Sequence, residues 1–225
     1  MLPPMRYGEI TFGTFIDRPN RFIAHVEAEG AVQTVHVKNT GRCRELLVPG
    51  VRVVLERATN PNRKTPFDLV AVYKNGDWLF NIDSQAPNKV MGEWLATQDY
   101  DVVRPEFTFG ASRVDFMMER DSERFLMEVK GCTLERDGIG YFPDAPTERG
   151  VKHLRELAGA ATQGWNCSIA FVLPEEGVHE ARPNMETHPA FGEALQAAQA
   201  AGVEVLFAEC AVTPQELRIT KVTKK

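Results

Sequence analysis

Two carboxylates and one ammonium group stand in two neighbouring segments whose residues alternate between apolar and charged. Asp115 lies in segment 112–118, and Glu128 and Lys130 close segment 125–130. Mg²⁺ favours one or two carboxylates together with water and substrate phosphate oxygens, so this set is suited to metal-dependent hydrolysis of a phosphodiester. The alternative is an ordinary cross-strand ion-pair cluster, in which Lys130 alone balances the two acidic groups.

The register of these two segments follows from the polar stretch between them, residues 119–123, which predicts a hairpin turn. With Asp121 and Ser122 at the centre of the turn, Asp115 falls directly opposite Glu128. A slip of one residue would bury the charges and expose the apolar residues, so the pattern supports this register. The side chains expected on the apolar face are those of Val114, Phe116, Met118, Phe125, Met127 and Val129.

The second half of the chain predicts helices and strands that would hold these residues in a mixed sheet. The expected elements are a helix over 87–96, strands near 101–109, 112–118 and 124–130, a helix over 147–161, a strand over 167–173, a helix over 190–201 and a last strand over 203–208. Thr147 is the expected N-cap of the second helix. This helix carries Arg149 and His153, which we expect beside the carboxylates as phosphate ligands; the alternative is a solvated amphipathic face.

The first part of the chain consists of short β-rich runs separated by close turns. Strands are expected over 7–15, 22–27, 32–37, 51–56, 69–73 and 78–82. Strands this short with turns this close predict a small antiparallel barrel, and an OB-like barrel is the natural candidate. We therefore divide the chain into a nucleic-acid-binding barrel domain over residues 1–85 and an α/β domain over residues 86–225.

Two polar loops of the barrel domain carry groups that could contact phosphates. The first loop presents an amide, a hydroxyl and two guanidinium groups around a glycine turn, from Asn39, Thr40, Arg42 and Arg44. A capped turn with solvated arginines explains the same residues equally well. Arg63 and Lys64 form the second basic loop, which by itself more often indicates a solvated surface.

Charge is unevenly distributed along the 225 residues, whose net charge is −5. Residues 1–90 hold 12 basic and 9 acidic residues, a net of +3, and the remainder holds 14 basic and 22 acidic residues, a net of −8. The negative total does not exclude a nucleic-acid partner, because phosphate binding depends on local basic clusters. No apolar run approaches the roughly 20 residues of a membrane span, and the first residues lack a signal-peptide core, so a cytoplasmic globular protein is expected.

Several segments together resemble the sugar fermentation stimulation protein A family of bacteria and archaea, with a PD-(D/E)xK nuclease-like C-terminal domain. The resembling segments are Asn39-Thr-Gly41, Arg113-Val-Asp-Phe116, Glu128-Val-Lys130 and, most specifically, residues 141–157. The resemblance implies an OB-like barrel, an α/β domain of restriction-endonuclease-like (αβββαβ) topology, DNA as the partner and a regulatory role in sugar metabolism. The resemblance does not decide whether the protein cleaves DNA. One departure is Val114, which stands where the name of the motif places proline.

The nuclease resemblance also implies a site for Mg²⁺ or Mn²⁺, in which Glu106 is the rival of Glu93 for one ligand position. The expected ligands are Asp115, Glu128, the carbonyl of Val129, and Glu93. Lys130 would stabilise developing charge or help to deprotonate the attacking water. Three classes stay open: a metal-dependent DNA nuclease, a non-catalytic DNA-binding regulator and an interaction scaffold. DNA is the expected partner, no membrane and no small-molecule cofactor are expected, and a homodimer is left open.

Overall fold

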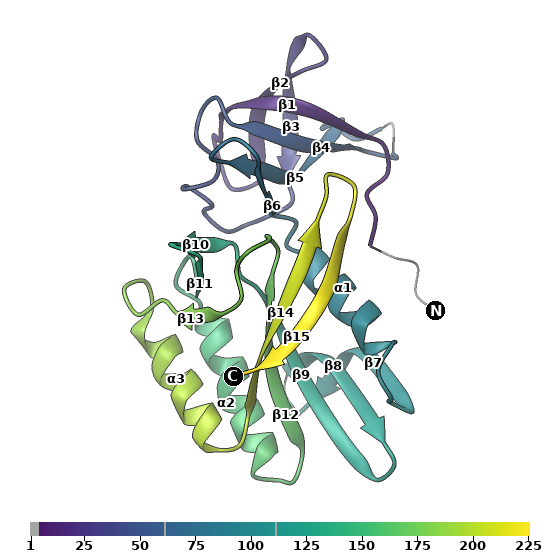
Figure 1. The fold of residues 1–225 in the computed structure, drawn as a ribbon, viewed down its shortest axis with the longest axis vertical. Helices are drawn as coiled ribbons and strands as arrows, with labels where there is room; N and C mark the ends of the chain where they lie inside the picture. Colours follow the sequence, from purple (N-terminus) through teal and green to yellow (C-terminus); the bar gives the residue numbers. More distant parts are fainter. Residues whose placement is uncertain (1–4, 61, 111) are drawn as a thin grey trace.

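The structure is a computed structural model that describes residues 5–60, 62–110 and 112–225, and its two parts lie one above the other in Figure 1. The upper part is built from strands whose short length matches the expectation from the sequence. They are β1 (Ile10–Asp17), β2 (Ile23–Ala28), β3 (Ala31–Val37), β4 (Arg52–Arg57), β5 (Phe67–Lys74) and β6 (Trp78–Asn81).

These strands close into a barrel. Neighbouring strands follow the order β3-β2-β1-β4-β5-β6, and a further parallel pairing of β3 with β5 joins the ends of the curved sheet. The interior is filled by a buried apolar cluster that includes Val26, Val35, Leu55 and Leu69, each from a different strand. The small β-barrel expected from the spacing of strands and turns is confirmed.

The lower part is an α/β domain with one large sheet and one small one. Its main elements are α1 (Ala86–Leu95), β7 (Val102–Phe109), β8 (Ser112–Arg120), β9 (Glu123–Gly131), α2 (Glu148–Ala161), β12 (Asn166–Leu173), α3 (Pro189–Ala200), β14 (Glu204–Val212) and β15 (Leu217–Lys224). The large sheet has the order β15-β14-β12-β9-β8-β7. Pairs β9–β12 and β12–β14 are parallel and the others are antiparallel, so the predicted mixed sheet with αβββαβ order is confirmed.

Helices cover both faces of the large sheet (Figure 1). On one face, Val90 of α1 belongs to a buried cluster with Phe116 and Met127 of the β8–β9 hairpin. On the other face, Leu154 of α2 belongs to a second cluster with Leu126. The middle of the hairpin therefore lies between two apolar layers, and its charged residues stand at its two ends, beside the turn and away from it.

The structure differs from the expectation in several short or exposed segments. The small sheet, made of β10 (Leu134–Arg136), β11 (Ile139–Phe142) and β13 (Ala181–Pro183), lies where irregular chain was expected, because strands of three or four residues carry no readable period. Strand β15 follows the strand expected to be the last. It is a polar edge strand whose residues are mostly exposed, so it lacked an apolar signal.

One residue of the predicted apolar face lies elsewhere. Val114 belongs to the cluster beneath α2, whereas Phe116 belongs to the cluster beneath α1. Strands β8 and β9 are paired only from Phe116 and Met127 toward the turn. The regular alternation of side chains between the two faces of the hairpin therefore ends before Val114.

The barrel and the α/β domain share one apolar cluster. Val54 and Leu79 of the barrel belong to the same buried set as Met91 of α1 and Leu217 of β15. The shared cluster buries apolar surface from both parts, so the two domains stabilise each other directly.

The segment before β1 makes a second connection between the two parts. Arg6 forms an isolated antiparallel bridge with Glu216, in the turn that joins β14 to β15, and the N–H of Tyr7 donates to the carbonyl of Gln215 at 2.9 Å. The start of the described chain is thereby attached to the last hairpin.

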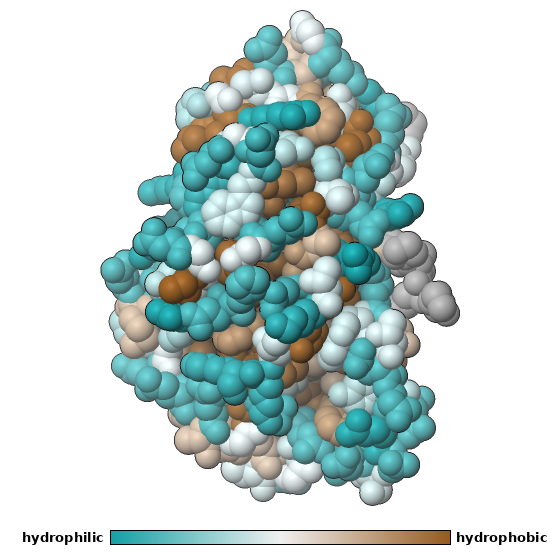
Figure 2. All heavy atoms as spheres, in the orientation of Figure 1, coloured by the Kyte–Doolittle hydropathy of each residue, from teal (hydrophilic) through white to brown (hydrophobic). Residues whose placement is uncertain are grey.

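No helix in the described residues is long and apolar enough to cross a membrane. The face drawn in Figure 2 is mostly covered by hydrophilic side chains, with hydrophobic residues in smaller patches between them.

Candidate functional site

The β8–β9 hairpin has the register expected from the sequence. Its pairing runs from Phe116 and Met127 to the turn at Asp121, whose φ is 52°. The ladder ends at Phe116 and Met127, so the predicted pairing of Asp115 with Glu128 lies one residue beyond the paired strands and stays a prediction. The polar turn at Asp121 sets the register of the paired strands, and apolar residues on both faces hold the hairpin between the two buried clusters.

The carboxylate of Asp115 accepts two hydrogen bonds that hold it in place. Oδ2 accepts the backbone N–H of Val129 at 2.7 Å, and Oδ1 accepts Nδ2 of Asn88 at 2.7 Å. Asn88 belongs to the first turn of α1, so this helix and the hairpin meet at the carboxylate. Burial raises the pKa of Asp115, and the negative charge of Glu128 raises it further. A bound cation would relieve this repulsion.

Glu128 is buried, with 2% of its surface exposed, and one of its oxygens contacts both neighbouring donors. Oε1 forms hydrogen bonds with Lys130 Nζ and with His153 Nδ1. Oε2 is buried without a hydrogen-bond partner among the described residues. Burial raises the pKa of Glu128, but the His153 hydrogen bond and the Lys130 ammonium outweigh burial and hold the pKa below its usual value. Glu128 is therefore an ionised group with one uncommitted oxygen.

Helix α2 brings Arg149 and His153 to Glu128. The helix begins after Thr147, the predicted N-cap, whose Oγ1 accepts the N–H of Gly150 at 3.0 Å. Arg149 Nε donates to His153 Nε2 at 3.3 Å, so Nδ1 is the ring nitrogen that carries the proton toward Glu128. His153 thus lies beside the Glu128 carboxylate, as expected from the sequence, and Arg149 contacts His153. Phosphate binding by Arg149 and His153 stays a prediction.

The third acidic ligand is the part of the predicted metal set that the structure does not bring together. Glu93 lies on α1, and its charged neighbours are Glu216 and Lys89. Its rival Glu106 lies on β7 between the paired residues Pro105 and Phe107, and its carboxylate pairs with exposed Arg113 at 2.7 Å. Among the described residues, no group of three or more His, Cys, Asp or Glu side chains is placed to hold a metal ion. Two carboxylates form the centre, and the choice of a third stays a prediction.

A cavity of about 770 Å³ opens where the barrel meets the α/β domain. The first predicted phosphate loop contributes four of its lining residues: Asn39, Thr40, Arg42 and Arg44. Across from them lie Thr147, Pro87 and Gly131. These three positions adjoin the groups described above, since Pro87 precedes Asn88 and Gly131 follows Lys130 in the sequence. The cavity therefore connects the barrel loop to the elements that carry the carboxylates.

Arg18 holds the barrel loop in shape. Its guanidinium group donates to four backbone carbonyls at distances of 2.6 to 2.9 Å: those of Arg21, Asn39, Gly41 and Arg42. Because these bonds occupy its terminal nitrogens, Arg18 organises the loop and is not a free charge for a ligand.

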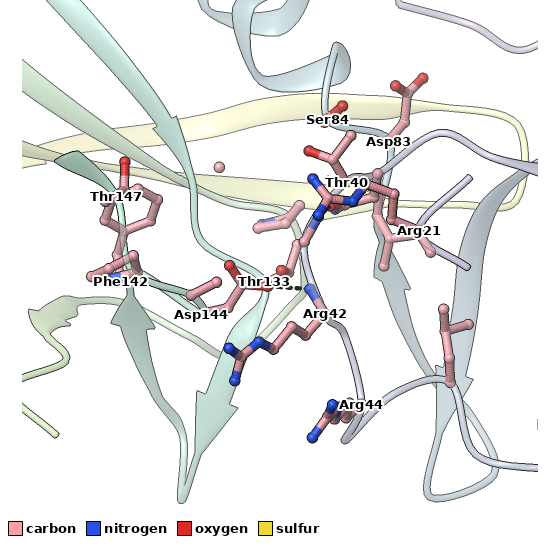
Figure 3. A pocket seen from close by; sticks show the side chains of 18 of the residues that line it. Arg21, Thr40, Arg42, Arg44, Asp83, Ser84, Thr133, Phe142, Asp144 and Thr147 are labelled. Atoms are coloured by element: carbon pink, nitrogen blue, oxygen red, sulfur yellow. Dashed lines mark hydrogen bonds between the residues drawn. The ribbon is translucent and has the colours of Figure 1, made fainter. Parts of the chain in front are cut away.

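Asp144, from the loop that precedes α2, joins the two domains at this cavity. Its Oδ2 accepts the backbone N–H of Arg42 at 2.8 Å, the dashed line in Figure 3. Gly41 permits the approach, because a Cβ there would lie 2.5 Å from Asp144 Oδ2 and 2.8 Å from Asn39 Oδ1. In Figure 3, the side chains of Arg42 and Arg44 extend beyond this contact while Asp144 and Thr147 lie on the other domain.

The second predicted loop is largely occupied by a structural ion pair. Arg63 donates through Nη1 and Nη2 to the two oxygens of Asp68, both at 2.8 Å, and His36 Nδ1 lies 2.7 Å from the same carboxylate. The adjacent Lys64 is exposed. Binding of nucleic acid by Arg63 and Lys64 stays a prediction.

Three positioning residues received no role from the sequence. Asn88 orients Asp115, Arg18 shapes the barrel loop, and Asp144 joins that loop to the α/β domain. The sequence could have drawn attention to Asp144, because this residue lies in segment 141–157, which carries the most specific family resemblance. No feature of the sequence pointed to Arg18, since its hydrogen-bond partners are backbone carbonyls, which every residue type carries.

Comparison with protein families covers nearly the whole chain. A family model described as "Sugar fermentation stimulation protein RE domain" matches residues 85–216, and one described as "SfsA N-terminal OB domain" matches residues 16–80. A sugar fermentation stimulation protein homolog of Desulfitobacterium hafniense is 49% identical over 216 residues, covering 95% of this chain and 94% of that protein. A homolog of Clostridium beijerinckii is 46% identical over 219 residues, covering 96% of each.

A solved structure supports the fold over the full length. "The structure of Pyrococcus Furiosus SfsA in complex with Ca2+" covers 100% of this chain and 97% of that chain with a TM-score of 0.81. The two sequences are 23% identical, so the likeness shows a shared architecture of barrel and α/β domain.

Proposed function

The chain belongs to the sugar fermentation stimulation protein family, and on that premise we propose that it binds DNA and hydrolyses phosphodiester bonds with Mg²⁺ or Mn²⁺. The observation that carries the proposal is Oε2 of Glu128, a buried oxygen without a hydrogen-bond partner among the described residues, beside the Asp115 carboxylate. A buried charged oxygen without a partner is costly, and a divalent cation is the partner that two facing carboxylates suit.

The residues that would hold the cation are Asp115, Glu128 and the carbonyl of Val129, with Glu93 or Glu106 as the candidate for a further ligand. When bound, the cation supplies charge neutralisation at the phosphate and lowers the pKa of a water molecule. The Pyrococcus furiosus protein of the same fold was solved with Ca²⁺, which like Mg²⁺ prefers oxygen ligands. That precedent supports a divalent cation in this chain.

The protein's own groups complete the chemistry. His153 and Lys130 keep Glu128 ionised, because they hold its pKa low despite burial. As the ammonium beside Glu128, Lys130 stabilises the charge that develops on the phosphate. Arg149, hydrogen-bonded to His153, positions the phosphate through its remaining N–H groups. On the barrel, Arg42 and Arg44 bind the DNA backbone from the wall of the cavity.

A second function, DNA binding without cleavage in a regulator of sugar metabolism, is favoured by a different observation. Oε1 of Glu128 already has Lys130 and His153 as partners, and the described residues contain no third acidic group at the centre. Such a centre balances much of its charge without a metal. In this reading the nuclease-like domain serves as a DNA-binding surface.

A plasmid-nicking assay with Mg²⁺ or Mn²⁺ separates the two functions. We expect nicked product that EDTA abolishes and that Lys130→Ala removes. Lys221→Ala is the matched control, because Lys221 is an exposed lysine on β15 that pairs with Glu209 outside the site. A mobility shift on the same DNA reports binding independently of cleavage.

Cleavage that survives Lys130→Ala would exclude the assigned centre. A DNA shift without product, in both metals and with every protein concentration tested, would favour the regulator. Absence of both shift and product at low salt would leave only an interaction scaffold, since phosphate contacts are strongest there.

A further inference from the structure

The interdomain cavity continues into a second basin on the barrel. This basin, of about 490 Å³, is lined among others by Phe22, His36 and Arg63. Asn39 and Thr40 line both the cavity and the basin. The two hollows therefore form one groove, which runs from the outer barrel surface to the wall next to Lys130.

The free charge of this groove is positive. Among the described residues, the guanidinium groups of Arg21, Arg42 and Arg44 have neither an ion-pair partner nor a hydrogen-bond acceptor, and all three line the cavity. Of the acidic lining groups, Asp83 pairs with Lys38 Nζ at 2.9 Å, whereas Asp144 keeps its charge and accepts the N–H of Arg42, so one carboxylate stands against three arginines and the balance stays positive. In the basin, Asp68 is paired with Arg63 and His36. The uncompensated groups are thus arginines, which suit a phosphate backbone.

Phe22 is an exposed aromatic ring of the basin, and in the sequence it follows residues that line the cavity. It is 51% exposed and lines the basin, while its neighbours Asn20 and Arg21 line the cavity. Its backbone is fixed, because its N–H donates to Asn20 Oδ1 at 2.8 Å and its carbonyl accepts the N–H of Val37 at 2.8 Å. An exposed ring on a rigid turn is poorly explained by packing, and it is preorganised for a planar ligand.

Phe12 makes a useful contrast to Phe22. It is 39% exposed, yet the guanidinium of Arg52 lies 4.1 Å from its ring centroid and covers it. Phe12 lines neither hollow. No stacked partner is found for Phe22 in the described part of the chain, so its ring face is free.

We propose that the groove binds single-stranded DNA, with a base stacked on Phe22 and the backbone held by Arg21, Arg42 and Arg44 on its way to the carboxylate centre. The inference rests on the proposed function and adds its substrate class. Grooves that join arginines to an aromatic ring are suited to single strands, because unpaired bases expose their faces whereas those of a duplex are stacked on one another.

The test is fluorescence anisotropy of labelled oligothymidylate and of a duplex of equal length, in EDTA so that binding is measured without cleavage. We expect tighter binding of the single strand. Phe22→Ala and Phe22→Leu should weaken that binding by about 5- to 100-fold, the loss expected for one base stack, while Phe22→Trp retains it. Phe12→Ala is the matched control, and thermal melts verify that each variant is folded.

Equal affinities of wild-type protein and Phe22→Leu for oligothymidylate would overturn the inference, as would tighter binding of the duplex. Neither result would count against the proposal that the protein hydrolyses phosphodiester bonds, because Lys130→Ala tests that proposal separately. Loss of single-strand binding in Phe22→Leu, in a protein that never nicks plasmid, would support this groove while refuting the hydrolysis.

Discussion

Gly41 is the position where one added methyl group tests how the barrel is joined to the α/β domain. The ideal Cβ of Gly41→Ala would lie 2.5 Å from Asp144 Oδ2 and 2.8 Å from Asn39 Oδ1. The φ of Gly41 lies outside the left-handed region, so alanine meets no backbone strain there. The whole cost is steric, and it acts on two side chains that already accept hydrogen bonds.

The magnitude follows from the bonds that must move. Asp144 Oδ2 accepts the N–H of Arg42 at 2.8 Å, and Asn39 Oδ1 accepts the N–H of Gly41 at 2.6 Å. A hydrogen bond to a charged group contributes about 1.5 to 3 kcal/mol and a neutral one about 1 kcal/mol, and solvent at this rim reduces both. We therefore expect Gly41→Ala to lower the free energy of unfolding by about 2 kcal/mol, or the melting temperature by roughly 4 to 8 °C.

Thermal and urea unfolding of the full chain provide the measurement. Gly159→Ala is the matched control, because that glycine lies within α2 with no atom within 4 Å of its ideal Cβ, and alanine there should add up to about 1 kcal/mol. In an Asp144→Ala background the cost of Gly41→Ala should fall by about half. A Gly41→Ala protein as stable as wild type, or an equal cost in both backgrounds, would refute the contact.

Three further predictions concern separate groups. Asn88→Ala removes the hydrogen bond to Asp115 Oδ1 and should raise the Mg²⁺ concentration needed for half-maximal nicking about tenfold. An unchanged metal dependence would contradict the positioning role of Asn88. Burial, with a nearby carboxylate, raises the pKa of Glu175 well above its ordinary value of 4.5. The native state therefore keeps a proton that the unfolded state releases, and stability falls as the pH rises above that value. Glu175→Gln should flatten this decline in urea unfolding, and parallel slopes for the two proteins would count against the reasoning. Arg63→Ala should lower the free energy of unfolding by about 1 to 2 kcal/mol, because Asp68 loses the two hydrogen bonds that it accepts from the guanidinium group. An unchanged free energy of unfolding would show that the ion pair is dispensable.

The sequence predicted the carboxylate hairpin well because its information is local. Alternation on both sides of a short polar turn determines which residues face each other, and the pairing of Phe116 with Met127 confirmed it. The cap at Thr147 is also local, since the acceptor and the donor lie three positions apart. Patterns of this kind can be read without knowledge of the tertiary fold.

Contacts between distant segments could not be predicted in the same way. Asn88 meets Asp115 only after α1 is placed on the sheet, and Arg18 binds carbonyls that any residue could supply. Strand β15 pairs with β14 and buries Leu217 in the shared apolar cluster, but its mainly polar sequence gave no strand expectation. What was missed depends on tertiary placement more than on residue type.

The bridge between Arg6 and Glu216 gives the barrel a second point of attachment. One attachment is covalent, through residues 81–86, and the other is the pairing of the N-terminal segment with the β14–β15 turn, reinforced by Tyr7. A body held at two points can rotate only about the line that joins them, and the bond from the Arg42 N–H to Asp144 across the cavity opposes that rotation. We therefore expect the groove to keep a nearly constant width, so that a strand enters it by threading from an open end and not by domain opening.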